Sequence, residues 1–261
     1  MKSLPRRRAA ILSVAVLVAA SVSLVGCAST DPATVVNAAA TGAREASASE
    51  LTMRIAVGSE VVEFTGTFSG DGRYGRMDVS AVDPSMSEAL MIDGKYFYRM
   101  DGLPQGKRWL VMTQEEVSPG VDPAAAVADP ADALALLEAT AEGVEELGEK
   151  DLRGDTVKGY RVTVDRDAAL AARVADGTFT DAAAEEQRST LPEEFPVDVW
   201  IDPDGLPAEM AFSLQVDSPG DGPVEVTLTM SFLSWDAELD LSEPPASEVI
   251  TLAELTGADR S

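Results

Sequence analysis

The chain has 261 residues, with 45 Asp and Glu against 20 Lys and Arg, and its formal net charge of −25 argues against binding nucleic acid through a basic patch. Hydrophobic residues make up 45% of the chain, which favours a folded domain over an acidic disordered polymer. There is no histidine, which excludes imidazole-based catalysis and His-ligated zinc, so we expect neither an enzyme nor a metal or cofactor site.

Residues 1–26 have the pattern of a secretory signal peptide. Four basic residues among the first eight precede an uncharged apolar run over residues 9–25. A run of about 17 residues is at the short limit for crossing a bilayer, so a permanent transmembrane anchor stays open as an alternative. The run ends in Gly26 and Cys27, and Cys27 is the only cysteine of the chain.

The sequence Leu-Val-Gly-Cys at residues 24–27 resembles the lipobox of bacterial lipoproteins. In those proteins the cysteine thiol receives a diacylglyceryl group, and the signal peptide is cut directly before it. The resemblance implies that Cys27 is the lipidated first residue of the mature protein, with palmitate-like acyl chains. Two such chains hold a protein stably on a membrane. The alternative is an ordinary signal peptide with an incidental cysteine.

The next segment, 27–50, is small, polar and Ala-rich, and it is interpreted as a lipidated N-terminus and tether with one weak helix over residues 32–43. From Leu51 onward apolar residues alternate with others, which is typical of strands with one buried face. Asp93-Gly94 fits a two-residue hairpin turn. We predict strands at 51–57, 62–68, 73–79, 89–92, 95–98, 109–112, 144–152, 156–164, 195–201, 206–216 and 224–232.

Three segments have helical character. Asp129-Pro130 provides an N-cap and a proline at the first helical position, and the helix is predicted over residues 130–142. The amphipathic stretch 166–175 predicts a second helix. The acidic, Ala-rich stretch 178–190 is interpreted either as a third helix or as a loop.

These elements predict an α+β fold with one large curved antiparallel sheet. A sheet of about ten or eleven long strands tends to curl into a half-barrel, and the two or three helices would cover its concave side. The domain is expected to span 51–250, followed by a tail at 251–261. The apolar concave side then forms either a packed core or a cavity for an apolar ligand.

The candidate cavity wall consists of apolar residues that alternate along the predicted strands. Substitution of Met210 or Leu228 by Arg is expected to abolish lipid binding without unfolding the domain. The candidate lipid-binding residues are Phe64, Met210, Phe212, Leu214, Val226, Leu228, Met230 and Phe232.

Several motifs together resemble the actinobacterial LppX/LprG (LppX_LprAFG) lipoprotein family, whose fold is similar to the LolA and LolB lipoprotein carriers. They are Cys27, "MIDGKYFYR" at 91–99, Asp129-Pro130, "ELGEKDLRGDTVKGYRVTVD" at 146–165, "VDVWIDPDGLPAEMAFSL" at 197–214 and "FLSWDAELDLSEPPASEV" at 232–249. The resemblance implies a half-barrel with helices across its open side, and binding of a lipid or acylated glycolipid for transport through the envelope.

The sequence therefore predicts a lipoprotein on the extracytoplasmic side of the cell membrane. Its expected partners are a lipid or acylated glycolipid, the membrane through the diacylglyceryl-cysteine, and a membrane transporter. The helices at 130–142 and 166–175 are expected to move as a lid. The alternative is a LolA-like envelope sensor or assembly factor, which would bind a protein partner and have a filled core.

Overall fold

The computed structural model describes residues 31–70, 72–80, 84–113, 116, 133–134, 137, 143–175, 180–218 and 222–257. Its strands form one sheet in the order β12-β6-β5-β4-β3-β2-β1-β11-β10-β9-β8-β7. The strands are β1 (Ala48–Val57), β2 (Glu60–Ser69), β3 (Tyr74–Met77), β4 (Met86–Ile92), β5 (Lys95–Met100), β6 (Trp109–Thr113), β7 (Glu145–Leu152), β8 (Asp155–Asp165), β9 (Glu194–Ile201), β10 (Pro207–Ser218), β11 (Gly222–Trp235) and β12 (Val249–Thr251).

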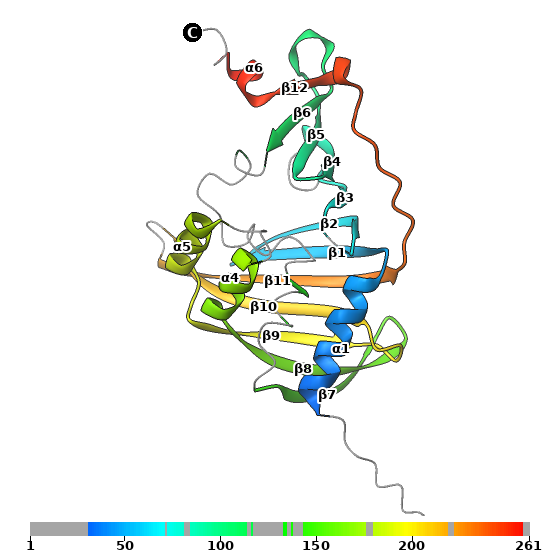
Figure 1. The fold of residues 1–261 in the computed structure, drawn as a ribbon, viewed down its shortest axis with the longest axis vertical. Helices are drawn as coiled ribbons and strands as arrows, with labels where there is room; N and C mark the ends of the chain where they lie inside the picture. Colours follow the sequence, from blue (N-terminus) through cyan, green and yellow to red (C-terminus); the bar gives the residue numbers. More distant parts are fainter. Residues whose placement is uncertain are drawn as a thin grey trace, which may run out of the picture.

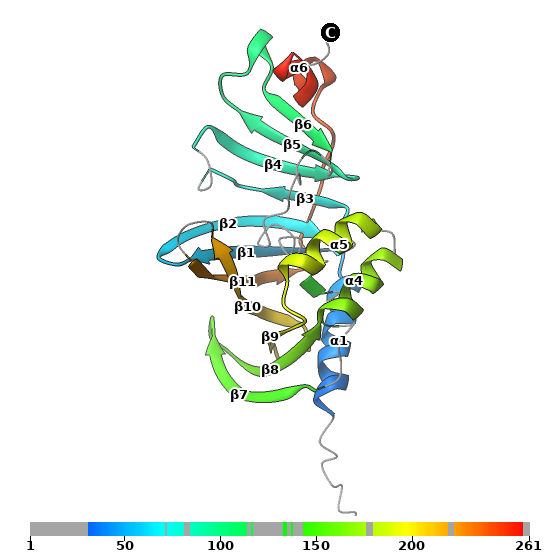
Figure 2. The same ribbon diagram turned by 90° about the vertical axis from the view of Figure 1, so that its left-hand side faces the viewer.

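The predicted curved α+β sheet is confirmed, with one change in its topology. Every neighbouring pair is antiparallel except β12 and β6, which run parallel, so the sheet is mixed and has twelve strands. The additional strand is β12, which has three residues. It lies at the edge of the sheet, where a long C-terminal segment returns to pair with β6. Figure 2 shows the curvature of the sheet and its open profile.

The described helices are α1 (Pro32–Glu45), α4 (Arg166–Ala175), α5 (Asp181–Thr190) and α6 (Leu252–Thr256). Two short 3-10 turns, Pro104–Gly106 and Ala246–Glu248, complete the described elements. Helix α4 has the bounds that the sequence predicts, and α5 decides the alternative at 178–190 in favour of a helix over its described part. Of the predicted helix at 130–142, only three residues lie in the described part of the chain, and these are helical.

Helix α1 is packed against the sheet, whereas the sequence predicts a weak helix in a tether. Proline occupies its first turn, and four small or β-branched residues at helical spacing are fully buried. They are Val36, Ala39, Ala40 and Ala43. Helix α1 is therefore part of the packed body of the protein, and β1 follows it from Ala48.

The predicted hairpin between β4 and β5 forms as the sequence indicates. Asp93 and Gly94 both have positive φ, at 49° and 76°, as the favoured two-residue turn requires. Ile92 pairs directly with Lys95 on either side of it. This turn fixes the register that places the aromatic side chains of β5.

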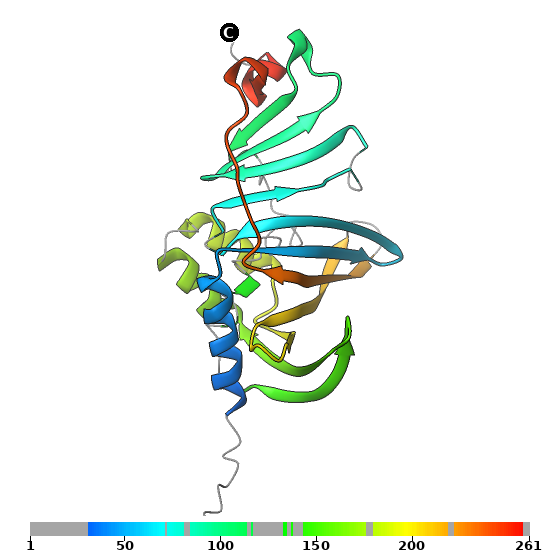
Figure 3. The same ribbon diagram turned by 90° about the vertical axis from the view of Figure 1, so that its right-hand side faces the viewer.

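Along its long axis the molecule has a lower and an upper half, as Figure 1 shows. The lower half contains β1, β2 and β7–β11 together with α1, α4 and α5. The upper half contains β3–β6, β12 and α6. The C-terminal strap (residues 236–248) runs from the end of β11 along the upper half to β12, as Figure 3 shows.

Candidate functional site

One face of the sheet is apolar and continuous through both halves. Strand pairing places seven residues side by side in a single row across β11, β1, β2, β3, β4, β5 and β6. In this order they are Phe232, Leu51, Gly66, Met77, Ala89, Tyr98 and Leu110. We call the face that carries this row the concave face. Its lower end packs with α1 in one hydrophobic cluster.

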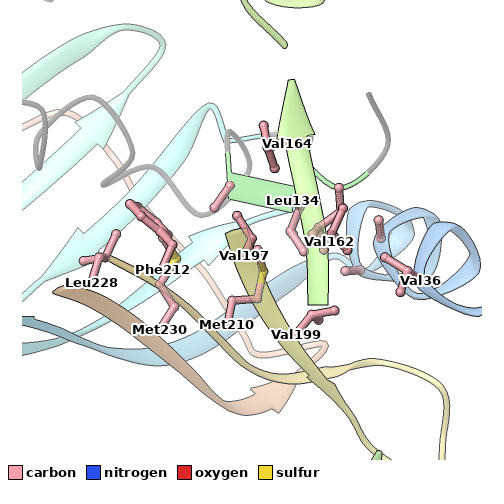
Figure 4. Packing of buried hydrophobic residues seen from close by; sticks show 14 of the residues in the cluster. Val36, Leu134, Val162, Val164, Val197, Val199, Met210, Phe212, Leu228 and Met230 are labelled. Atoms are coloured by element: carbon pink, nitrogen blue, oxygen red, sulfur yellow. The ribbon is translucent and has the colours of Figure 1, made fainter. Parts of the chain in front are cut away.

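The sequence-predicted cavity residues all lie on the concave face, in the lower half. Seven of the eight are at most 9% exposed, and Phe64 is half-buried beside them. All but Val226 pack in one cluster with residues of α1 and with Leu134 and Leu137. Figure 4 shows Met210, Phe212 and Leu228 directed into this packed region. The structure brings the eight residues together; that they contact a lipid stays a prediction.

The degree of burial changes one expectation from the sequence. Met210 is 2% exposed and Leu228 is 1% exposed, so each is surrounded by other side chains. An arginine at either position would place a charge in a packed apolar core, which is strongly unfavourable. We therefore expect these substitutions to unfold the domain, whereas the sequence alone indicated that they would leave it folded.

Phe68 lies at the junction of the two halves. A Cβ atom added at Gly66 or at Gly75 would come within 2.7 Å of the Phe68 ring, so the ring lies over two glycines of neighbouring strands. Met91 pairs with Gly75 and continues the apolar surface into the upper half. Gly66 and Gly75 thus give the concave face a depression, which the Phe68 ring occupies.

The upper half of the concave face is less buried than the lower half. Tyr96 and Tyr98 of β5 both lie on this face, as does Met112 of β6, and all three are half-buried. We call this surface the upper concave patch. Sequence reasoning did not select these residues, although the alternation of "KYFYRM" at 95–100 indicates them. The residues of the patch are Met77, Met86, Tyr96, Tyr98, Met100 and Met112.

Every methionine after Met1 lies on the concave face by strand register. Four are buried, at 9% exposure or less, and the other four are half-buried. The buried group is Met53, Met91, Met210 and Met230, and the half-buried group is Met77, Met86, Met100 and Met112. Unbranched thioether side chains adapt to irregular apolar ligands, and they also fill gaps in cores.

The opposite face of the upper half is covered by the chain itself. Leu90, Ile92, Phe97 and Trp109 form a second cluster there, and residues of the C-terminal strap and β12 pack on it. The strap is held at this end by an ion pair of 2.7 Å between Lys95 and Glu243. The upper half therefore has one apolar face closed by its own strap and one apolar face that is only partly covered.

Among the described residues, the titratable groups with shifted pKa values form no catalytic cluster. Hydrogen bonds from the Ser80 side chain and backbone lower the pKa of Asp78, and the guanidinium groups of Arg166 and Arg188 lower that of Asp167. These are surface contacts of turns and helix ends. On the concave face, burial raises the pKa of Tyr98 above its ordinary value.

A pocket of about 390 Å³ lies away from the concave face. It is lined by the end of α1, the turn between β2 and β3, and the C-terminal strap, including Arg44, Tyr74 and Leu239. In the described residues no cluster of acidic side chains could hold a metal ion. No helix within the described ranges is long and apolar enough to cross a membrane.

Comparison with known proteins finds several solved structures of low similarity. No protein-family model matches the sequence, and no curated protein sequence matches it either. LprF from Mycobacterium bovis matches in structure at 12% identity, with a TM-score of 0.47 over 82% of this chain and 96% of that chain. Lipoprotein LppX from Mycobacterium tuberculosis matches at 12% identity and a TM-score of 0.46, over 82% of this chain and 100% of that chain.

LppX gives its name to the family that the sequence motifs resemble. A further match is the complex of MucA and MucB from Pseudomonas aeruginosa, at 13% identity and a TM-score of 0.37, over 86% of this chain and 65% of that chain. At such low identity and TM-scores, the likeness does not extend to a ligand or a partner.

Two predicted features lie outside the described residues. One is the signal peptide at 1–26 with the lipidation site Cys27. The other is most of the lid helix at 130–142, of which Ala133, Leu134 and Leu137 are described and buried. Both remain predictions from the sequence.

Proposed function

We propose that this protein is a membrane-anchored lipoprotein that binds an acyl chain of a lipid or acylated glycolipid on its concave face, at the upper concave patch. The observation that carries this proposal is the apolar face that continues from the packed lower half into a half-buried surface of thioethers and tyrosines. A soluble domain does not usually leave such a surface without a ligand or a partner.

The energetics suit reversible binding. Burying one sixteen-carbon chain contributes on the order of 10 kcal/mol, at about 0.8 kcal/mol per methylene group. Most of this is offset when the chain is taken from a bilayer, where it is already in an apolar environment. The protonated hydroxyl of Tyr98 can donate a hydrogen bond to an ester or carboxyl oxygen near the end of the chain.

The protein acts as a binding protein rather than an enzyme, on the extracytoplasmic side of the cell membrane. The lack of histidine and the surface origin of the shifted carboxyl pKa values support this assignment. Its partners are the lipid, the bilayer through acylated Cys27, and a membrane transporter that delivers or removes the ligand.

The position of α1 limits how far the domain can move from the membrane. Because α1 starts at Pro32, only residues 28–31 separate the folded body from Cys27. Five residue steps reach at most about 18 Å, whereas a tether extending to Leu51 could reach about 80 Å. The domain therefore stays close to the bilayer and exchanges lipid there, instead of crossing the envelope as a shuttle.

A fluorescent label at the exposed N-terminal part of α1 tests this short tether. Cys27 is the only native cysteine, so Thr34→Cys provides a unique labelling site when Cys27 is acylated. We expect strong energy transfer to acceptor lipids in vesicles, and a marked decrease when twenty Gly and Ser residues are inserted after Thr30. Equal transfer with and without the insertion would contradict the short tether.

Native mass spectrometry of residues 28–261, purified without detergent, tests lipid binding directly. We expect an added mass of lipid size that disappears on solvent extraction, and analysis of the extract would identify the ligand. A bare protein that also stays bare after incubation with membrane lipids would rule out the lipid proposal.

The second candidate is an envelope sensor or assembly factor that binds a protein partner. The close packing of the lower half favours it, because a filled core is what that alternative predicts. In this case the upper concave patch would contact a protein segment. The bare mass described above, together with capture of a membrane protein by the intact acylated chain, would support this candidate.

A further inference from the structure

The eight methionines in the described part of the chain fall into two groups by their solvent exposure. Met53, Met210 and Met230 are at most 2% exposed, and Met91 is 9% exposed. The other four belong to the upper concave patch and are half-buried. Since both groups lie on one face of one sheet, the chain provides its own internal comparison between accessible and protected thioethers.

The four accessible methionines lie on three adjacent rows of the sheet, one on each of the strands β3, β4, β5 and β6. Met86 and Met100 pair directly across β4 and β5. Met77 lies in the row of Tyr98, and Met112 pairs with Tyr96. A change in the polarity of these four side chains would therefore change the whole upper concave patch at once.

We propose that the upper concave patch is a site of reversible methionine oxidation, and that oxidation of Met77, Met86, Met100 and Met112 turns off ligand binding. The effect on binding rests on the function proposed above, whereas the oxidation itself does not. The four side chains are half-buried, so each is partly accessible to solvent, and the surrounding face is apolar. A sulfoxide on this face places a polar, chiral group where an acyl chain would lie.

The chemistry needs a peroxide as the oxidant. The sulfur lone pair attacks one oxygen of hydrogen peroxide, the O–O bond breaks, an S=O bond forms, and water leaves after proton transfer. The sulfur is oxidised by two electrons and the peroxide is reduced by two. A methionine sulfoxide reductase reverses the step with a dithiol, which becomes a disulfide while the oxygen leaves as water.

Peptide mass mapping after peroxide treatment tests the site itself. The protein purified from membranes is exposed to dilute hydrogen peroxide for increasing times. We expect a 16 Da addition, one oxygen atom, at the four patch methionines before any is found at Met53, Met210 or Met230. Oxidation at similar rates in both groups would overturn the proposal, whatever the protein binds.

Binding of a fluorescent sixteen-carbon fatty acid tests the consequence. We expect at least about tenfold weaker binding after oxidation, because an uncompensated polar group in an apolar site costs a factor of ten or more. Sulfoxide reductase with a dithiol should restore it. Unchanged binding by protein that is oxidised at all four positions would overturn the switch.

Two variants assign the effect to the patch. Fatty-acid binding by the variant M77L/M86L/M100L/M112L is measured before and after peroxide treatment. We expect the two affinities to be equal. The matched variant M53L/M210L/M230L should lose binding on oxidation as the unaltered chain does. If no fatty acid binds before treatment, the proposed function fails, and the mass pattern alone then decides whether the oxidation site exists.

Discussion

Glutamate at Met77 is expected to weaken binding of an acyl-chain probe by at least about a hundredfold while the domain stays folded. Met77 is half-buried at the edge of the upper concave patch that borders the lower half, between Gly66 and Ala89. In the free protein the carboxylate can reach water. Under a bound acyl chain it would lose its hydration without gaining a partner, which is strongly unfavourable.

The control for this variant is the same change on the other face of the sheet. Thr65→Glu lies on the neighbouring strand β2 and is exposed on the polar face, where the Thr65 and Thr52 hydroxyls are 3.2 Å apart. Fluorescence titration should show a loss only for M77E, and circular dichroism should show that both variants are folded. Equal binding by the two variants would place the ligand elsewhere.

Truncation of Leu228 to alanine is expected to lower the free energy of unfolding by about 2–5 kcal/mol, because it leaves a cavity in a closely packed region. Leu228 is 1% exposed and pairs with Ile55 and Phe212 across the concave face. The M210R variant should be more severe and fail to fold, because its guanidinium would be buried without a partner.

Leu233 provides a matched control on the same strand. It is 43% exposed, so L233A should change the free energy of unfolding by less than about 0.5 kcal/mol. Urea unfolding of L228A and L233A measures the difference, and circular dichroism shows whether M210R folds. Similar stabilities for L228A and L233A would show that the lower half is not a packed core, and a cavity among the sequence-predicted residues would again be the better site.

The two halves of the concave face are therefore expected to have different roles, one in stability and the other in binding. The lower half buries its apolar residues against α1 and the described helical residues Leu134 and Leu137, and so supplies most of the packed core. The upper half extends the same sheet, and its other face is closed by the C-terminal strap. The strap thus supports the back of the surface on which we place the ligand.

The same division bears on the choice between a lipid carrier and a sensor. A carrier must exchange its ligand, which is easier on a partly open surface than in a closed core. A partner protein would find in the upper concave patch a set of adaptable methionine side chains. The mass measurement separates the two cases, since only the carrier retains a lipid through purification.

The alternating pattern of the strands was sufficient to predict the curved sheet from the sequence. In β10 and β11 the apolar side chains recur at every second position, and backbone geometry then places them on one face. The Asp93-Gly94 turn likewise sets its hairpin, because both positions need positive φ. Periodicity of this kind depends on local geometry and survives in any tertiary arrangement.

The role of α1 and the division of the concave face were decided only by the tertiary structure. The small side chains of α1 give a weak hydrophobic pattern, and its burial depends on the neighbouring strands, which come much later in the chain. Likewise, an alternating strand has the same pattern whether its apolar side is packed or partly open. Met210 and Met112 therefore look alike in the sequence, and only the packing of distant segments makes one a core residue and the other a candidate ligand contact.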